Sequence, residues 1–326
     1  MEKSLSANYI NRTSLLFIWL VLLPHQLYSL DLKTPDDYEK VAKKVFHQGD
    51  FRRVIALSQK GLKMRPSSVT LLNYLGQSYF YLKKYHNSMT QFQRILNQAV
   101  QINDPKTYGL AYNNIGEIHR AKGQYKKALK FYRKALTHNE MAKHYQGIAS
   151  TYHNVARCYR AMGQTNKAIS YLDISIRFKS DIQDTLGLAL SYIEMAHILE
   201  EKDQLNRSLD YLEKSERLLK RYKSAYHMAK VLGNLGRIHY IKNMEDEALA
   251  YFQKALALGE QVRDSGGTAT RCVHIAIIYM KRQRYRRAYS FMNRAVIIKG
   301  RLGEKLSPRE ANFHVTLKRL SQLQKR

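Results

Sequence analysis

The sequence predicts an all-α protein, a solenoid of helix–turn–helix units that ends in a capping helix. Three observations support this prediction. Small residues recur every forty positions along most of the 326-residue chain. Each unit contains two stretches in which apolar residues recur at spacings of three and four, as amphipathic helices require. Helix-capping sequences stand at both ends of the repeated region, where a solenoid has to cover its core.

The repeat is clearest at three aligned positions of each unit. The first position holds glycine or alanine: Gly76, Gly116, Ala156, Ala196, Gly236 and Ala276. The second, twelve residues later, is also small: Ser88, Ala128, Ala168, Ser208, Ala248 and Ala288. The third, sixteen residues after the first, is bulky and apolar: Phe92, Tyr132, Leu172, Leu212, Phe252 and Met292. Small residues are needed where two helix backbones approach closely, so we expect the helices of each unit to pack there.

Seven units are expected between residues 30 and 303. The first is the shortest, because Ala42 precedes Gly76 by 34 residues whereas the later units repeat every forty. The expected limits of the units are about 35–67, 68–107, 108–147, 148–187, 188–227, 228–267 and 268–303. A short turn such as Lys122–Tyr125 separates the two helices of a unit, and a polar connector such as residues 261–267 separates successive units.

Both ends of the array carry helix-start signals. Thr34 is a suitable N-cap, followed by Pro35 at the first helical position. Ser307 and Glu310 have the spacing of a capping box, which would open a last helix. The apolar residues of that helix fall on one stripe: Phe313, Leu317 and Leu320. Residues 304–326 are therefore expected to form a basic capping helix over the last unit.

These repeated positions resemble the tetratricopeptide repeat, a helix–turn–helix unit usually of 34 residues. The forty-residue spacing resembles a variant with longer helices, and the resemblance covers over four-fifths of the chain. It implies a right-handed superhelix whose first helices line a concave groove that holds peptide segments. It therefore implies a protein-interaction scaffold and not an enzyme, with a protein or peptide, including an acidic one, as its partner.

The candidate site is the face of the first helices that would point into this groove. It carries Asn114, Glu117, Arg120, Asn154, Arg157, Arg160, Glu194, Asn234, Arg237 and His274. An asparagine amide donates and accepts hydrogen bonds, which suits an extended peptide backbone, and in the family an asparagine at this position contacts bound peptide. The arginines suit an acidic side chain or a terminal carboxylate. Alternatively, the asparagines bond neighbouring helices and hold the spacing of the repeats.

The charge of the chain suggests a second function. A net charge of +29 and a pI near 10 favour anionic partners. The candidate anion surface is a basic cluster in the last unit: Lys281, Arg282, Arg284, Arg286 and Arg287. The alternative function is electrostatic binding of nucleic acid or an anionic membrane surface through this basic C-terminal region. A third alternative, from the resemblance to exported bacterial arrays, is a sensory or adaptor component of a signalling assembly.

The sequence contains no motif for catalysis, metal binding or a cofactor, so we expect none of these. Cys158 and Cys272 fall at apolar positions of units that lie three repeats apart, which predicts two core residues and no disulfide. His119 and His239 fall at a position that other units fill with tyrosine. We therefore expect these histidines to be core residues.

Residues 1–29 have the pattern of a signal peptide. Lys3 and Arg12 precede an apolar run over residues 14–23, which is too short to span a bilayer. We expect export to the periplasm or the outside of a bacterial cell, and a cytoplasmic location if this segment is not a signal. Export would make nucleic acid an unsuitable partner.

The export hypothesis predicts a processed chain. The protein isolated from its native host should lack roughly thirty N-terminal residues, because signal peptides are removed. Intact-mass spectrometry measures this directly. A mass equal to that of the full 326-residue chain would contradict export by this route.

Overall fold

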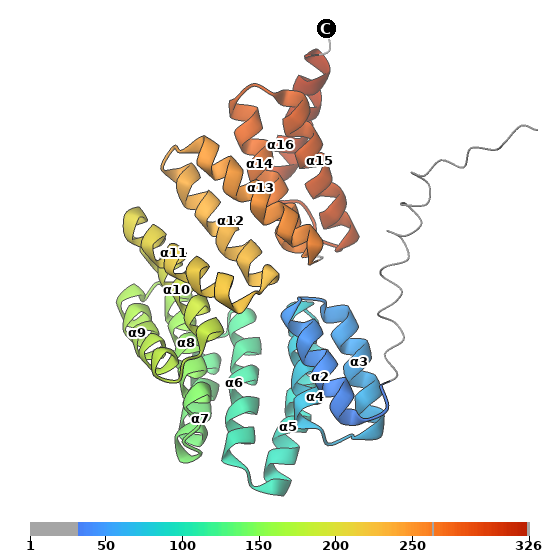
Figure 1. Ribbon diagram of the computed structural model, residues 1–326, viewed down its shortest axis with the longest axis vertical. Coiled ribbons are helices and arrows are strands. Elements are labelled where there is room, and N and C mark those ends of the chain that lie inside the picture. Colours follow the sequence, from blue (N-terminus) through green and yellow to red (C-terminus); the bar gives the residue numbers. More distant parts are fainter. Residues whose placement is uncertain (1–31, 263, 325–326) are drawn as a thin grey trace, which may run out of the picture.

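The structure, a computed structural model, describes residues 32–262 and 264–324. Within these residues it contains fifteen α-helices and no β-strand, which confirms the predicted fold class. The predicted signal peptide lies outside the described residues. Fourteen helices form seven consecutive antiparallel pairs, and a fifteenth follows them (Figure 1).

Each pair corresponds to one repeat. The pairs are α2 (Pro35–His47) with α3 (Phe51–Met64), α4 (Val69–Tyr81) with α5 (Tyr85–Ile102), α6 (Pro105–Ala121) with α7 (Tyr125–Met141), α8 (Tyr145–Ala161) with α9 (Thr165–Asp181), α10 (Thr185–Glu201) with α11 (Leu205–Tyr222), α12 (Ala225–Ile241) with α13 (Glu245–Gln261), and α14 (Ser265–Lys281) with α15 (Tyr285–Arg301). The last helix is α16 (Pro308–Leu323).

From the third pair on, the helix pairs begin three residues before the limits that the periodicity indicates. α6, α8 and α10 begin at residues 105, 145 and 185, whereas the expected limits are 108, 148 and 188. The polar connector at residues 261–267 is also shorter than expected, because Ser265 to Gly267 form the first turn of α14. The Asp264 side chain accepts a hydrogen bond from the Gly267 amide and caps this turn. These first turns contain small and polar residues, so the spacing of apolar residues does not indicate that they are helical.

The residue at the first aligned position is smaller where the residue that faces it is larger: glycine faces an aromatic ring, and alanine faces leucine or methionine. A β-carbon at Gly76, Gly116 or Gly236 would lie 2.7, 2.5 or 2.9 Å from the ring of Phe92, Tyr132 or Phe252. The three units with alanine have Leu172, Leu212 and Met292 in place of the ring. At the second aligned position, Ser88 and Ser208 donate hydrogen bonds to the Gly76 and Ala196 carbonyls, at 2.8 and 2.9 Å. The combined volume of the two facing residues is therefore nearly the same from one of these repeats to the next.

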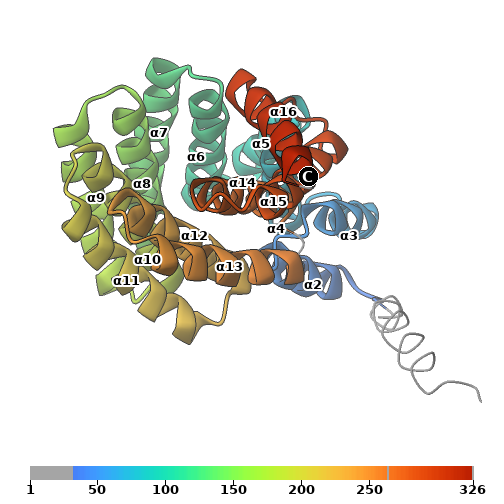
Figure 2. The same ribbon diagram turned by 90° about the horizontal axis from the view of Figure 1, so that it is seen from above.

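The pairs wind into a superhelix that returns over its own start. Seen from above, α14 to α16 lie over the N-terminal helices (Figure 2). The Tyr226 ring of α12 packs edge-on against Phe51 at 6.2 Å. A β-carbon at Gly49, whose φ is +82°, would lie 2.8 Å from the same tyrosine ring. Lys83 and Glu304, 221 positions apart, form an ion pair of 2.9 Å. These contacts join the first two repeats to the sixth repeat and to the segment between α15 and α16.

Both ends are capped as expected. Thr34 with Asp37 and Ser307 with Glu310 form capping boxes at the starts of α2 and α16. Leu317 of α16 is fully buried in the core of the last repeat, and Phe313 packs against the same cluster. Helix α16 thus covers the apolar face that α15 would otherwise expose.

The volume match predicts opposite effects for two glycines of α12. Gly236→Ala should destabilise the protein, because overpacking against Phe252 costs about 1–3 kcal/mol and exceeds the ~1 kcal/mol that alanine gains as a helix former. Gly233→Ala should stabilise it, since its β-carbon would meet one atom of Arg271 at an ordinary 3.6 Å. Urea unfolding followed by circular dichroism measures both.

A double substitution tests the cause. In a Phe252→Leu background, Gly236→Ala recreates the Ala196–Leu212 pair and should stabilise the protein instead of destabilising it. If Gly236→Ala were as stabilising beside Phe252 as it is beside leucine, the steric explanation would be wrong.

Candidate functional site

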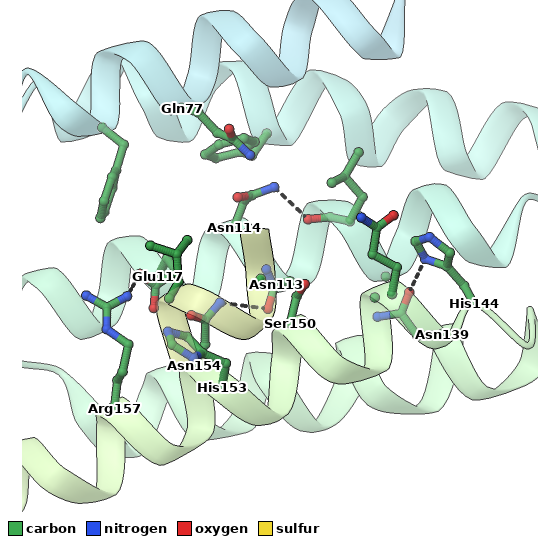
Figure 3. A pocket seen from close by; sticks show the side chains of 18 of the residues that line it. Gln77, Asn113, Asn114, Glu117, Asn139, His144, Ser150, His153, Asn154 and Arg157 are labelled. Atoms are coloured by element: carbon green, nitrogen blue, oxygen red, sulfur yellow. Dashed lines mark hydrogen bonds and ion pairs between the residues drawn. The ribbon is translucent and has the colours of Figure 1, made fainter. Parts of the chain in front are cut away.

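The inner face of the superhelix contains a cavity of about 440 Å³. Its walls come from α4, α6, α8 and α10, the first helices of four successive repeats, with the ends of α7 and α9 at its side (Figure 3). The labelled lining residues are mostly polar: Gln77, Asn113, Asn114, Glu117, Asn139, His144, Ser150, His153, Asn154 and Arg157. The cavity therefore combines amide, hydroxyl and charged groups on a rigid helical wall.

Two of the predicted groove asparagines link neighbouring repeats. The Asn114 amide donates to the Asn73 side-chain oxygen of the preceding repeat at 3.2 Å and to the Leu110 carbonyl at 3.0 Å. The Asn154 amide donates in the same way to Asn113 at 3.2 Å. Both asparagines line the cavity, but only 8% of each residue is exposed. Each therefore forms a hydrogen bond to the preceding repeat, and their role in ligand contact stays a prediction.

Glu117 is the centre of a charged network on this wall. Its carboxylate accepts hydrogen bonds from Arg120 at 2.8 Å, from Arg157 at 2.9 Å and from the Tyr132 hydroxyl at 2.5 Å. Burial alone would raise the pKa of Glu117, but Arg157, Arg120 and the hydrogen bonds outweigh it and lower that pKa below its ordinary value. Glu117 is therefore held as a carboxylate between α6, α7 and α8.

The network continues along the groove through the other predicted arginines. Arg160 bonds Glu194 of the next repeat at 2.6 Å, and Arg157 lies 3.8 Å from the same carboxylate. Arg237 pairs with Glu200. All three arginines thus have carboxylate partners within the chain, and a ligand carboxylate would have to share them.

The two remaining groove residues lie further along the array. Asn234 interacts with His197 of the preceding repeat, and this contact opposes the lowering of the His197 pKa that burial causes. His274 stacks on Phe252 at 4.8 Å, and its Nδ1 lies 2.9 Å from the Thr270 carbonyl. Neither lines the cavity between α4 and α10.

The sequence argument missed the cavity residues that come from the second helices. Asn139 of α7 is 1% exposed and accepts a hydrogen bond from His144 at 3.2 Å. A β-carbon at Gly109 or Gly147 would lie 2.3 or 2.4 Å from its side-chain oxygen, so two glycines make room for it. Lys179 of α9 is 3% exposed and also lines the cavity. The sequence does contain a sign of these residues. Asn139 and Lys179 are polar, whereas the equivalent positions of other repeats hold Ala99 and Leu219.

The candidate anion surface is partly neutralised by the preceding repeat. Lys281 pairs with Glu245 at 2.9 Å, and Arg282 pairs with Asp246 at 2.7 Å. Arg286 donates to the Gln324 carbonyl at 2.9 Å. The guanidinium of Arg287 lies 5.8 Å from the centre of the Tyr279 ring. A shallow hollow beside the end of α16 is surrounded by Arg284, Arg286 and Arg287.

Cysteines and histidines form no cluster in the described part of the chain. Cys158 and Cys272 are buried free thiols, and burial raises the pKa of each to about 11. His119 and His239 are partly buried and pack on Phe131 and Tyr251. Residues 32–262 and 264–324 hold no group of three or more potential metal ligands. Over the same residues, no helix has both the length and the hydropathy to cross a membrane.

Comparison with protein families gives a match that spans most of the array. The model of the tetratricopeptide repeat matches residues 67–141, 107–179 and 187–261, together more than half of the chain. Among curated proteins, BBSome complex member BBS4 of Mus musculus is 28% identical over 101 residues. That segment is 31% of this chain and 18% of BBS4, so the match spans less than a fifth of that protein.

Solved structures share the fold at low sequence identity. A Rap protein complexed with competence and sporulation factor has a TM-score of 0.66 at 16% identity, over 88% of this chain and 80% of that one. The Cut9–Hcn1 hetero-tetramer of APC/C has a TM-score of 0.59 at 16% identity, over 94% and 52%. Apo RapI has a TM-score of 0.56 at 12% identity, over 82% and 98%. These similarities show a shared superhelical architecture.

The Glu117 network predicts a pH-dependent loss of stability. Glu117→Gln should destabilise the protein at pH 7 by about 2 kcal/mol, between the values for exposed and for buried ion pairs. Because folding lowers the pKa of Glu117, its charge contributes fully to the stability of the fold above its ordinary pKa of 4.5. This stabilisation is lost as the pH falls through the lower pKa that Glu117 has in the folded protein. The difference between the two proteins should therefore shrink below about pH 5.

Urea unfolding between acid and neutral pH measures this difference. Glu140→Gln is the matched control, because Glu140 is exposed near the end of α7, and it should change the stability little at any pH. A Glu117→Gln deficit that persisted unchanged at acid pH would show that the charge of Glu117 is not its source.

Proposed function

Because this chain belongs to the tetratricopeptide repeat family, we propose that it is a protein-interaction scaffold that captures a peptide segment or partner protein in its concave groove. Tetratricopeptide repeat proteins serve as interaction scaffolds, and arrays of this kind present extended concave surfaces. The family assignment supports the general role. The choice of a peptide segment as ligand rests on the inner cavity.

The cavity is the observation that carries this proposal. It lies on the inner face of four successive first helices, so a bound segment would contact several repeats at once. Asn113, Gln146 and Ser150 contribute groups that can donate and accept hydrogen bonds, as an extended backbone requires. Phe80, Tyr81 and Leu190 add apolar surface to the same walls. A cavity that combines apolar surface with polar groups suits a peptide better than it suits a purely apolar ligand.

The structural neighbours support the same class of ligand. The Rap structure is a complex with competence and sporulation factor, and the Cut9 structure is an assembly with Hcn1. Each finding belongs to that protein, and at 16% identity it supports the proposal through the fold alone. A role as the sensory or adaptor component of a signalling assembly would use the same groove. Export is a separate proposal that rests on residues 1–29.

A bulky residue in the cavity should block binding. Ser150 lines the cavity on α8 and is partly buried. We expect Ser150→Tyr to weaken the binding of peptides selected from a random library by at least about tenfold, or ~1.4 kcal/mol, because the ring would occupy the space of the ligand. Fluorescence anisotropy with labelled selected peptides measures the affinity.

The control carries the same substitution on the outer helix of the same repeat. Ser170 is exposed on α9, outside the residues that line the cavity, so Ser170→Tyr should leave the affinity unchanged. Circular dichroism checks that both variants keep their helical content. Equal affinity of both variants and the wild type would contradict binding in the cavity.

A further inference from the structure

We propose that the cavity binds a carboxylate group of the peptide ligand beside the ammonium group of Lys179. This inference rests on the proposed function, because it names the chemistry of the ligand that the groove would hold. The site lies where α8, α9 and α10 meet, and Lys179 belongs to the second helix of its repeat. It is therefore distinct from the first-helix face that the sequence analysis identified.

Lys179 is a buried cation that forms no ion pair with the described residues of the chain. Only 3% of the residue is exposed, and its Nζ donates a hydrogen bond of 2.8 Å to Ser191 of α10. The Ser191 hydroxyl lies 3.1 Å from Nδ1 of His153, which also lines the cavity. No carboxylate of residues 32–262 or 264–324 lies within 4.0 Å of the Lys179 Nζ. An ammonium has three donors, so this one keeps donors for a ligand.

The surroundings of Lys179 favour an anion. Burial and four cations, Lys179, Arg157, Arg120 and Arg160, together lower the pKa of His153 well below its ordinary value. Glu117 and Glu194 are already bonded to those arginines, and Asp184 acts on Lys179 without forming an ion pair within 4.0 Å. Among the residues that line the cavity, Arg157 and Lys179 are cationic and Glu117 is the one carboxylate, so positive charge is in excess where water is partly excluded and a new ion pair would be strengthened.

The equivalent positions in other repeats show that stability does not require a lysine here. The six residues spaced by forty are Ala99, Asn139, Lys179, Leu219, Gly259 and Lys299. Leu219 is fully buried in its core cluster, and Lys299 pairs with Glu310 at 2.5 Å. Burying an unpaired ammonium is costly, and an apolar residue of similar length would avoid that cost. The lysine at position 179 is thus explained by a ligand and not by the packing.

The protonation of Lys179 provides a direct signal of carboxylate binding. Burial lowers the pKa of Lys179 to about 8, and Asp184 in the α9–α10 turn opposes the shift. A ligand carboxylate favours the charged form and raises this pKa again, so binding near pH 8 should take up a proton. The other groups that face the site are His153 and Arg157 of α8 and Ser191 of α10.

The first experiment uses two synthetic libraries of short random peptides that differ only at the C-terminus, one free and one amidated. If an acidic side chain binds, the wild-type protein should enrich Asp or Glu at one position from both libraries. If the terminal carboxylate binds, it should retain peptides from the free library alone. Lys179→Met should bind the selected peptides at least about tenfold more weakly, since a hydrogen bond to a charged group is lost. Lys299→Met, at the equivalent position outside the cavity, should bind them as the wild type does.

The second experiment uses the wild-type protein alone. Isothermal titration calorimetry of one selected peptide at pH 8, in two buffers of different ionisation enthalpy, should show uptake of a proton. Three outcomes would overturn the carboxylate site and leave the scaffold function standing: binding without preference for a carboxylate, equal binding to Lys179→Met, and binding without proton uptake. Failure to retain peptides from either library would overturn both proposals.

Discussion

The close contact between the two helices of each repeat is the constraint on which the rest of the structure depends. At this contact, glycine faces an aromatic ring and alanine faces leucine or methionine. In the six repeats from α4 to α15 the facing residues keep nearly the same combined volume, which favours a similar packing distance in each pair. A constant pair geometry makes the pairs stack with a regular rotation, and regular stacking brings the first helices to the inner side of the superhelix. The cavity is a consequence of that regularity.

The inner face stabilises this arrangement with polar contacts instead of apolar ones. Asn114 and Asn154 each bond an asparagine of the preceding repeat, and Arg157 connects Glu117 of one repeat to Glu194 of another. The groove therefore satisfies most of its own charges while remaining open to water. A ligand would meet a wall that is already ordered, so it would lose little of its binding energy in ordering side chains. Lys179 differs, because no carboxylate of residues 32–262 or 264–324 lies within 4.0 Å of its ammonium group.

The superhelix also depends on contacts between its ends. Tyr226 occupies the space beside Gly49 and Phe51, and Lys83 reaches Glu304. In an open solenoid each repeat touches only its neighbours, whereas here the first two repeats also touch the sixth repeat and the segment that follows α15. These contacts limit how far the array can extend, and they keep the first helices around a common axis.

The sequence by itself determined the fold class, the number of helix pairs, the N-cap at Thr34, the capping box at Ser307 and the burial of both cysteines. It could do so because pairing and capping depend on residues close in the chain, and forty-residue periodicity reports them directly. The limits of the helices were less well predicted, since first turns such as Ser265 to Gly267 lack apolar residues. Only the tertiary structure decided which polar residues have partners: Glu117 with Arg157, Lys281 with Glu245, and Lys179 with the Ser191 hydroxyl instead of a carboxylate of the described residues. These distances depend on how successive repeats are stacked, and a single sequence does not encode that stacking in any local pattern.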